Sequence, residues 1–154
     1  MVHSHMIVSV VFPGFNTTAV PGASPAFNRK TCQLSLAVNI PPGFSFGIKA
    51  VGYRGRYQLD SNVTAIQRSL YYFPGEIAQA TASSVFTGPG NDEYHNILEF
   101  SDPVLSPCGE STILNLASSI RVDNKANEQG GGYISVDSLK IGENQTYAFD
   151  WVKC

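Results

Sequence analysis

The sequence predicts an all-β protein, built as a two-sheet antiparallel β-sandwich or a jelly-roll-like domain. Three observations favour this class. Apolar and polar residues alternate with a period of two over many short stretches. Turn clusters rich in Gly and Pro separate these stretches at intervals of about ten residues. No stretch sustains a helical period over three turns, and evenly spaced short strands are typical of sandwiches and jelly rolls.

The expected strands follow one another along the whole chain. Strong alternation covers residues 34–40, 44–50, 114–122, 133–136 and 147–152, and weaker alternation covers 7–12, 53–59, 63–73, 81–87 and 96–100. Turn clusters lie between them, among them Pro41-Pro42-Gly43, Pro74-Gly75 and the Gly130-Gly131-Gly132 run. No repeat or linker divides the pattern, so one domain is expected over residues 7–154.

The two ends and the charge limit the possible partners. Residues 1–6, with an internal His-Met, read as the remnant of an expression tag and are excluded from the fold. The net charge is −2 and only 14% of residues are charged, so we expect no nucleic-acid partner. No apolar run approaches the roughly 18 residues that span a bilayer, so we expect no membrane partner.

Catalytic signatures are missing from the sequence. It contains no G-x-S-x-G, H-E-x-x-H, P-loop, G-x-G-x-x-G or C-x-x-C motif. We therefore predict no catalytic residue, no metal site and no cofactor. His95, the only histidine outside the first six residues, reads as a solvated loop residue. A hydrolase with a cross-strand carboxylate pair stays an open alternative, with Glu99 and Asp150 the acids most deeply set in strand patterns.

The segment Tyr53-Arg54-Gly55-Arg56-Tyr57 is the main candidate for ligand binding. In a strand, Tyr53, Gly55 and Tyr57 share one face, and Arg54 and Arg56 share the other. Two tyrosine rings beside a bare glycine suit stacking on a sugar ring, and arginine forks suit hydroxyls or carboxylates. A bulge at Gly52 would instead turn both tyrosines into the core. We take Tyr53, Arg54, Arg56 and Tyr57 as the candidate site.

Several features favour secretion. Glycosylation sequons begin at Asn16, Asn62 and Asn144, and these three are the candidate glycosylation sites. The low charge, with abundant Ser, Thr, Gly and Asn, is common in extracellular β proteins.

Seven motifs, in order along the chain, resemble one known family. They are Arg29-Lys30-Thr31-Cys32-Gln33, Pro41-Pro42-Gly43-Phe44, Tyr53-Arg54-Gly55, Val63-Thr64-Ala65 with Tyr71-Tyr72-Phe73, Ser106-Pro107-Cys108-Gly109, Arg121-Val122-Asp123-Asn124 and Trp151-Val152-Lys153-Cys154. The family comprises small secreted proteins of filamentous fungi and actinobacteria, known as domain of unknown function 4360. The resemblance spans residues 7 to 154 and implies secretion, disulfides and a β-rich fold, with no activity.

The resemblance also bears on the three cysteines. The resemblance implies four cysteines, the first in a Gly-Cys-Pro segment that this sequence lacks. Either the sequence starts after that segment or the protein has lost it, and the tag remnant directly before Ile7 favours the first alternative. Three cysteines permit one bond in three ways. Cys32 begins a strand and Cys154 ends one, so antiparallel pairing would bring them level, and Cys108–Cys154 is geometrically comparable. We predict Cys32–Cys154, with Cys108 unpaired.

Together these observations predict a secreted, non-catalytic β-sandwich that recognises an extracellular glycan or protein, in a cell wall or on a host. The alternatives are the small glycan-active hydrolase and a structural or self-assembling extracellular protein. The sequence leaves the oligomeric state open.

Overall fold

Ten strands form in the described part of the chain, and each includes a stretch with predicted alternation. The computed structural model describes residues 7–22, 28–142 and 149–154. The strands are β1 (Val8–Ala19), β2 (Arg29–Val38), β3 (Phe44–Ile48), β4 (Ala50–Leu59), β5 (Thr64–Tyr72), β6 (Ala80–Thr87), β7 (Gly90–Glu99), β8 (Thr112–Asp123), β9 (Gly132–Ile141) and β10 (Phe149–Lys153). Strand β7 includes His95, so the predicted loop at that position is wrong.

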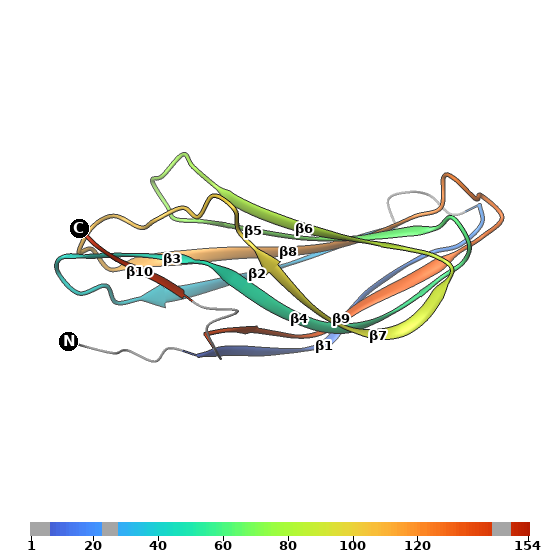
Figure 1. The fold of residues 1–154 in the computed structure, drawn as a ribbon, viewed down its shortest axis with the longest axis horizontal. Helices are drawn as coiled ribbons and strands as arrows, with labels where there is room; N and C mark the ends of the chain where they lie inside the picture. The colour runs from blue at the N-terminus through green and yellow to red at the C-terminus, as the bar shows by residue number, and fades with distance from the viewer. Residues whose placement is uncertain (1–6, 23–27, 143–148) are drawn as a thin grey trace.

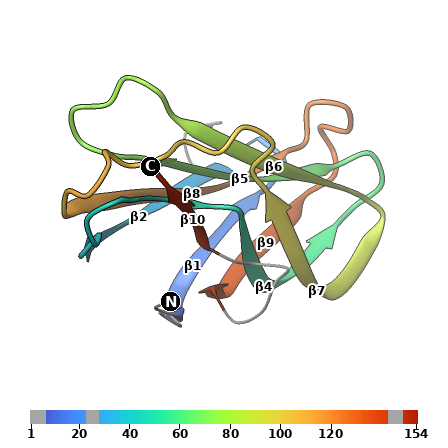
Figure 2. The ribbon, with the colours of Figure 1, turned by 60° about the vertical axis from the view of Figure 1, so that its left-hand side comes forward.

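The strands form two four-stranded antiparallel sheets and a two-stranded pair (Figure 1). Sheet A has the order β1-β9-β4-β7, sheet B has the order β2-β8-β5-β6, and β10 pairs with β3. Figure 2 shows sheets A and B as two layers, with the β3–β10 pair at the end of the sandwich that holds the C-terminus. This arrangement confirms the predicted two-sheet antiparallel sandwich. By length and hydropathy, the described residues include no helix that could cross a membrane.

The inner faces of the two sheets form one hydrophobic core. Strand β8 shows the pattern best, because every second residue from Leu114 to Val122 is buried, including Ser118, as its alternation predicts. The largest fully buried side chains include Tyr53, Tyr71 and Phe46. The core therefore contains several phenol groups, whose hydroxyls need hydrogen-bond partners inside the protein.

The chain bends at Lys49, and the residues that face the core change there. Phe46 before the bend and Tyr53 after it are both buried, although they stand an odd number of positions apart. From the sequence, a bulge at Gly52 is the predicted origin of such a change of face. The change occurs instead between β3 and β4, where the Lys49 carbonyl accepts a hydrogen bond from the Phe100 amide at 3.0 Å. The bend leaves Tyr53 pointing into the core.

The disulfide joins Cys108 to Cys154, so the predicted Cys32–Cys154 bond and the unpaired Cys108 are both wrong. Strand β10 pairs with β3 and not with β2, which places Cys154 beside the start of β3, where its amide donates to the Gly43 carbonyl at 2.8 Å. The Gly109 amide donates at 2.8 Å to the first carbonyl of β3 and brings Cys108 to the same place. The two Cα atoms lie 6.2 Å apart.

Cys32 is the free cysteine. It lies on β2 opposite Ser118 of β8, half-buried against the core. The disulfide therefore links the two segments that flank β3, and Cys32 is remote from that link in the strand order.

We expect Cys108→Ser to lower the free energy of unfolding by up to about 4 kcal/mol, because the bond closes a loop across a sequence separation of 46 residues. Cys32→Ser is the matched control and should cost about 1 kcal/mol or less. Urea denaturation measures both. Thiol titration of the denatured, unreduced chain should give one free thiol for the unmodified protein. Three free thiols, or a larger loss for Cys32→Ser, would contradict the pairing.

Candidate functional site

Strand β4 is an interior strand of sheet A and carries the four predicted ligand-binding residues on two opposite faces. Arg54 and Arg56 are exposed on the outer face. Tyr53 is fully buried, and Tyr57 is half-buried on the same inner face, with its ring centroid 5.1 Å from that of Phe86. The tyrosine stacking platform is therefore wrong, and the alternative in which both tyrosines belong to the core is confirmed.

The Tyr53 hydroxyl connects the two sheets. It lies 2.8 Å from Ser69 Oγ on β5 and 2.6 Å from Ser118 Oγ on β8, and both strands belong to sheet B. Burial raises the pKa of Tyr53 above its ordinary value of 10.0, and the bonds to the two serines offset part of this rise. Because all three hydroxyls are buried, each depends on the others for hydrogen bonding.

Gly55 lies beneath an internal tyrosine. Tyr94 stands opposite Gly55 on β7, and its hydroxyl donates to the Ser135 carbonyl on β9 at 2.6 Å. A Cβ atom on Gly55 would lie 2.6 Å from the Tyr94 hydroxyl and would collide with the Ser135 carbonyl oxygen. The missing side chain at Gly55 thus makes room for Tyr94, and no sugar ring can reach it from outside.

On the outer face of sheet A, the two arginines stand among polar residues of the neighbouring strands. Arg54 lies opposite His95 of β7 and Ser138 of β9, and Arg56 lies opposite Glu93 of β7. Side chains two positions apart on a strand point the same way with about 7 Å between them. Neither guanidinium forms an ion pair with any residue that the structure describes. Both are therefore available to an external ligand.

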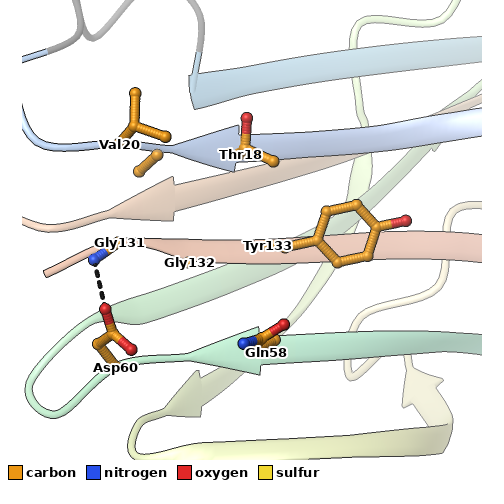
Figure 3. Close-up of a pocket in the computed structure, with 8 residues that line it drawn as sticks. Thr18, Val20, Gln58, Asp60, Gly131, Gly132 and Tyr133 are labelled. Atoms are coloured by element: carbon orange, nitrogen blue, oxygen red, sulfur yellow. Dashed lines mark hydrogen bonds between the residues drawn. The ribbon is translucent and has the colours of Figure 1, made fainter.

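The outer face ends at a pocket of about 230 Å³ (Figure 3). Gln58 borders it and is the next outward residue of β4 after Arg56. The lining residues are Thr18, Ala19, Val20, Gln58, Asp60, Gly131, Gly132 and Tyr133. Figure 3 shows the Tyr133 ring and the Gln58 amide on neighbouring strands, and these two residues are register partners in the β4–β9 ladder. The pocket thus offers one half-buried aromatic ring beside several polar groups.

The pocket does not contain a pair of carboxylates. Asp60 is the only acidic residue among those that line it, and its Oδ2 accepts a hydrogen bond from the Gly131 amide at 2.8 Å. Glu99 lies on β7 of sheet A, whereas Asp150 lies on β10, which pairs with β3. Among the described residues, no group of three or more His, Cys, Asp or Glu side chains is placed to hold a metal ion.

The three sequons occupy different environments. Asn16 is half-buried on β1. Asn62 is exposed in the turn between β4 and β5, with a φ of 62° that asparagine tolerates better than most residues. Asn144 lies outside the described residues, as does the predicted tag remnant at residues 1–6.

Gln58 and Tyr133 line the pocket but are not among the site residues predicted from the sequence. Gln58 follows Arg54 and Arg56 at a spacing of two, so the alternation of β4 could have extended the arginine face to it. Tyr133 joins the site only through the pairing of β9 with β4, which are more than seventy residues apart in sequence. No local pattern carries information on that pairing.

Three comparisons relate this geometry to known proteins. The family described as "Domain of unknown function (DUF4360)" matches residues 3–154. An "Uncharacterized secreted protein" of Arthroderma benhamiae is 31% identical over 150 residues, which make up 96% of this chain and 61% of that protein. The chain therefore spans about three fifths of the length of this curated relative. With the disulfide, this relative confirms the predicted secretion.

Two solved structures share a distant likeness. A structure of TmCBM61 in complex with beta-1,4-galactotriose is 13% identical, with 88% of this chain and 87% of that chain covered and a TM-score of 0.35. A structure of the infectious bursal disease virus Gx strain is 10% identical, with 96% of this chain and 32% of that chain covered and a TM-score of 0.41.

We expect Gly55→Ala to lower the free energy of unfolding by about 3 kcal/mol, because the added methyl group overlaps the Ser135 carbonyl and crowds Tyr94. Gly14→Ala, in β1 of the same sheet, is the control, since a Cβ there meets no atom within 4 Å. Its effect should stay within about 0.5 kcal/mol. Urea denaturation compares the two variants, and equal losses would show that Tyr94 does not need the bare glycine.

Alkaline pH should destabilise the protein through three buried tyrosines. Burial raises the pKa of Tyr53, Tyr71 and Tyr94, and the Asp137 carboxylate raises that of Tyr94 further. The folded chain therefore keeps protons that the unfolded chain loses above about pH 10. Their contribution to stability is complete below that pH and falls as the pH rises through the folded pKa values.

Urea denaturation between about pH 8 and 11, followed with tyrosinate absorbance, measures this dependence. Tyr94→Phe should reduce the pH slope of the free energy of unfolding by about one third, because two of the three buried phenols remain. An unchanged slope would contradict the role of Tyr94.

Proposed function

We propose that this chain, which belongs to the family of domain of unknown function 4360, binds an extracellular glycan on the outer face of sheet A. The chain is a secreted β-sandwich protein. The proposed site consists of Arg54, Arg56 and Gln58 on β4 with Tyr133 on β9. The observation that carries the proposal is the pocket between Gln58 and Tyr133 at the end of the arginine row.

The chemistry of these four side chains suits a sugar chain. A glycan presents closely spaced hydroxyl groups that both donate and accept hydrogen bonds. The Gln58 amide can donate and accept, and the two guanidinium groups supply forked donors. The Tyr133 ring offers an apolar face beside a hydroxyl, which suits the mixed apolar and polar surface of a sugar ring.

The size of the pocket indicates how much of a glycan enters it. At about 230 Å³, the pocket is smaller than the roughly 300–1,000 Å³ of sites that enclose drug-sized ligands. It therefore suits one ring of a longer chain. The following rings would then lie along the face towards Arg56 and Arg54, whose side chains succeed Gln58 along β4.

A protein partner and a hydrolytic role are both less well supported at this site. Cores of protein interfaces are depleted of acidic residues, whereas Glu93 stands opposite Arg56 on this face. Hydrolysis of a glycosidic bond needs two carboxyl groups about 5–10 Å apart, and Asp60 is the only acid that lines the pocket. Binding without catalysis is therefore the function we propose.

Isothermal titration calorimetry with neutral oligosaccharides of different backbones tests this site. We expect one backbone to bind, and we expect Tyr133→Ala to weaken binding about tenfold through loss of ring contact. Tyr72→Ala is the matched control, because Tyr72 is a half-buried tyrosine on the outer face of sheet B. No binding to any backbone, or equal losses for both variants, would refute the assignment.

A further inference from the structure

The outer face of sheet B carries more basic than acidic side chains. Its charged side chains, by strand alternation and register, are Arg29 on β2, Arg68 on β5, and Arg121 and Asp123 on β8. Three of the ten basic residues of the chain thus lie on this face, with one of the twelve acidic residues. The chain as a whole has a net charge of −2, so this face is locally cationic on an anionic protein.

The arginines are closely spaced. Arg29 and Arg121 are direct partners in the β2–β8 ladder, which places their Cβ atoms about 5 Å apart. Arg68 lies opposite Ser119, two positions from Arg121, and is therefore a diagonal neighbour of Arg121 at about 7–8 Å. Like charges that face each other directly across a ladder destabilise a sheet. A bound anion would relieve this repulsion.

The protein itself neutralises little of the positive charge of these arginines. Arg121 lies 3.8 Å from Asp123, a long contact between partly exposed groups that is worth little in water. The same carboxylate also accepts a hydrogen bond from the Lys125 amide at 2.9 Å. In the part of the chain that the structure describes, neither Arg29 nor Arg68 forms an ion pair.

The side chains between the arginines are short, and several of them carry hydroxyl groups. Thr31, Ser119 and Ser83 stand in one row with Arg68 across the four strands of the sheet. Short side chains allow an extended chain to lie flat on the sheet, and their hydroxyls can bond to sugar hydroxyls. The next row contains Val85, an exposed apolar residue that can contact the C–H groups of a sugar ring.

We propose that this cationic face (Arg29, Arg68 and Arg121) binds a linear polysaccharide that carries carboxylate groups, at a site separate from the one on sheet A. The guanidinium fork matches a planar carboxylate, and arginines spread over more than one row require anionic groups that repeat along a chain. Nucleic acid is disfavoured, because its dense phosphate charge calls for a basic domain and this chain is acidic overall.

The contrast with sheet A supports the separation of the two sites. On the outer face of sheet A, Arg54 and Arg56 of β4 and Lys140 of β9 are accompanied by Glu93 and Glu99 of β7, so that basic and acidic groups are mixed. That balance suits a neutral glycan, whereas the excess of positive charge on sheet B suits an acidic one. The two ligands would therefore occupy opposite outer faces of the sandwich.

Binding to polygalacturonate and to its fully methyl-esterified form, at low and at high salt, tests the proposal. The two probes share one backbone and differ in charge. We expect the acid form to bind, the ester to bind at least about tenfold more weakly, and salt to weaken binding of the acid form because exposed ion pairs are screened. The double variant Arg29→Gln/Arg68→Gln should weaken binding of the acid form about tenfold.

The double variant Lys49→Gln/Lys153→Gln is the matched control, because it makes the same change of charge at two exposed residues that belong to neither proposed site. It should retain binding to polygalacturonate. Absence of binding to the acid form, equal binding of the ester, or equal losses for the two double variants would overturn the proposal. Tighter binding to dextran sulfate than to polygalacturonate would overturn the carboxylate assignment. None of these results depends on Tyr133, so failure here is distinguishable from failure of the site on sheet A.

Discussion

The hydrogen bonds between the Tyr53 hydroxyl and the hydroxyls of Ser69 and Ser118 connect the two sheets, and the orientation of β4 depends on them. Side chains alternate along a strand, so a buried Tyr53 requires that Arg54 and Arg56 face solvent. A slip of one residue would bury two guanidinium groups and leave two serine hydroxyls without their partner. The same contact that stabilises the core thus determines which side chains of β4 can meet a ligand.

The absence of a side chain at Gly55 also stabilises this orientation of β4. The Tyr94 ring passes over it and its hydroxyl reaches the Ser135 carbonyl on β9, so that an inner contact ties three strands of sheet A together. This network satisfies the Tyr53 and Tyr94 hydroxyls within the protein. Both proposed binding sites therefore lie on the outer faces, which carry the exposed arginines.

The low content of charge makes the position of each arginine informative. Only 14% of the residues are charged, and yet the two outer faces differ in balance, since acids accompany the arginines on sheet A and only Asp123 does so on sheet B. The two proposed ligands, a neutral glycan on sheet A and an acidic one on sheet B, differ in the same way. The disulfide lies at the end of the sandwich with β3 and β10, away from the pocket end of β4.

Local pattern was sufficient for the all-β class, for most strand positions and for the opposite directions of the tyrosines and arginines in β4, because a period of two is a property of the strand alone. The local pattern does not determine which strands pair. Which strand lies beside β10 decides the partner of Cys154, and which strand lies beside β4 brings Tyr133 to Gln58. These contacts join residues far apart in sequence, so only the tertiary structure decided the disulfide, the pocket and the grouping of Arg29, Arg68 and Arg121 on one face.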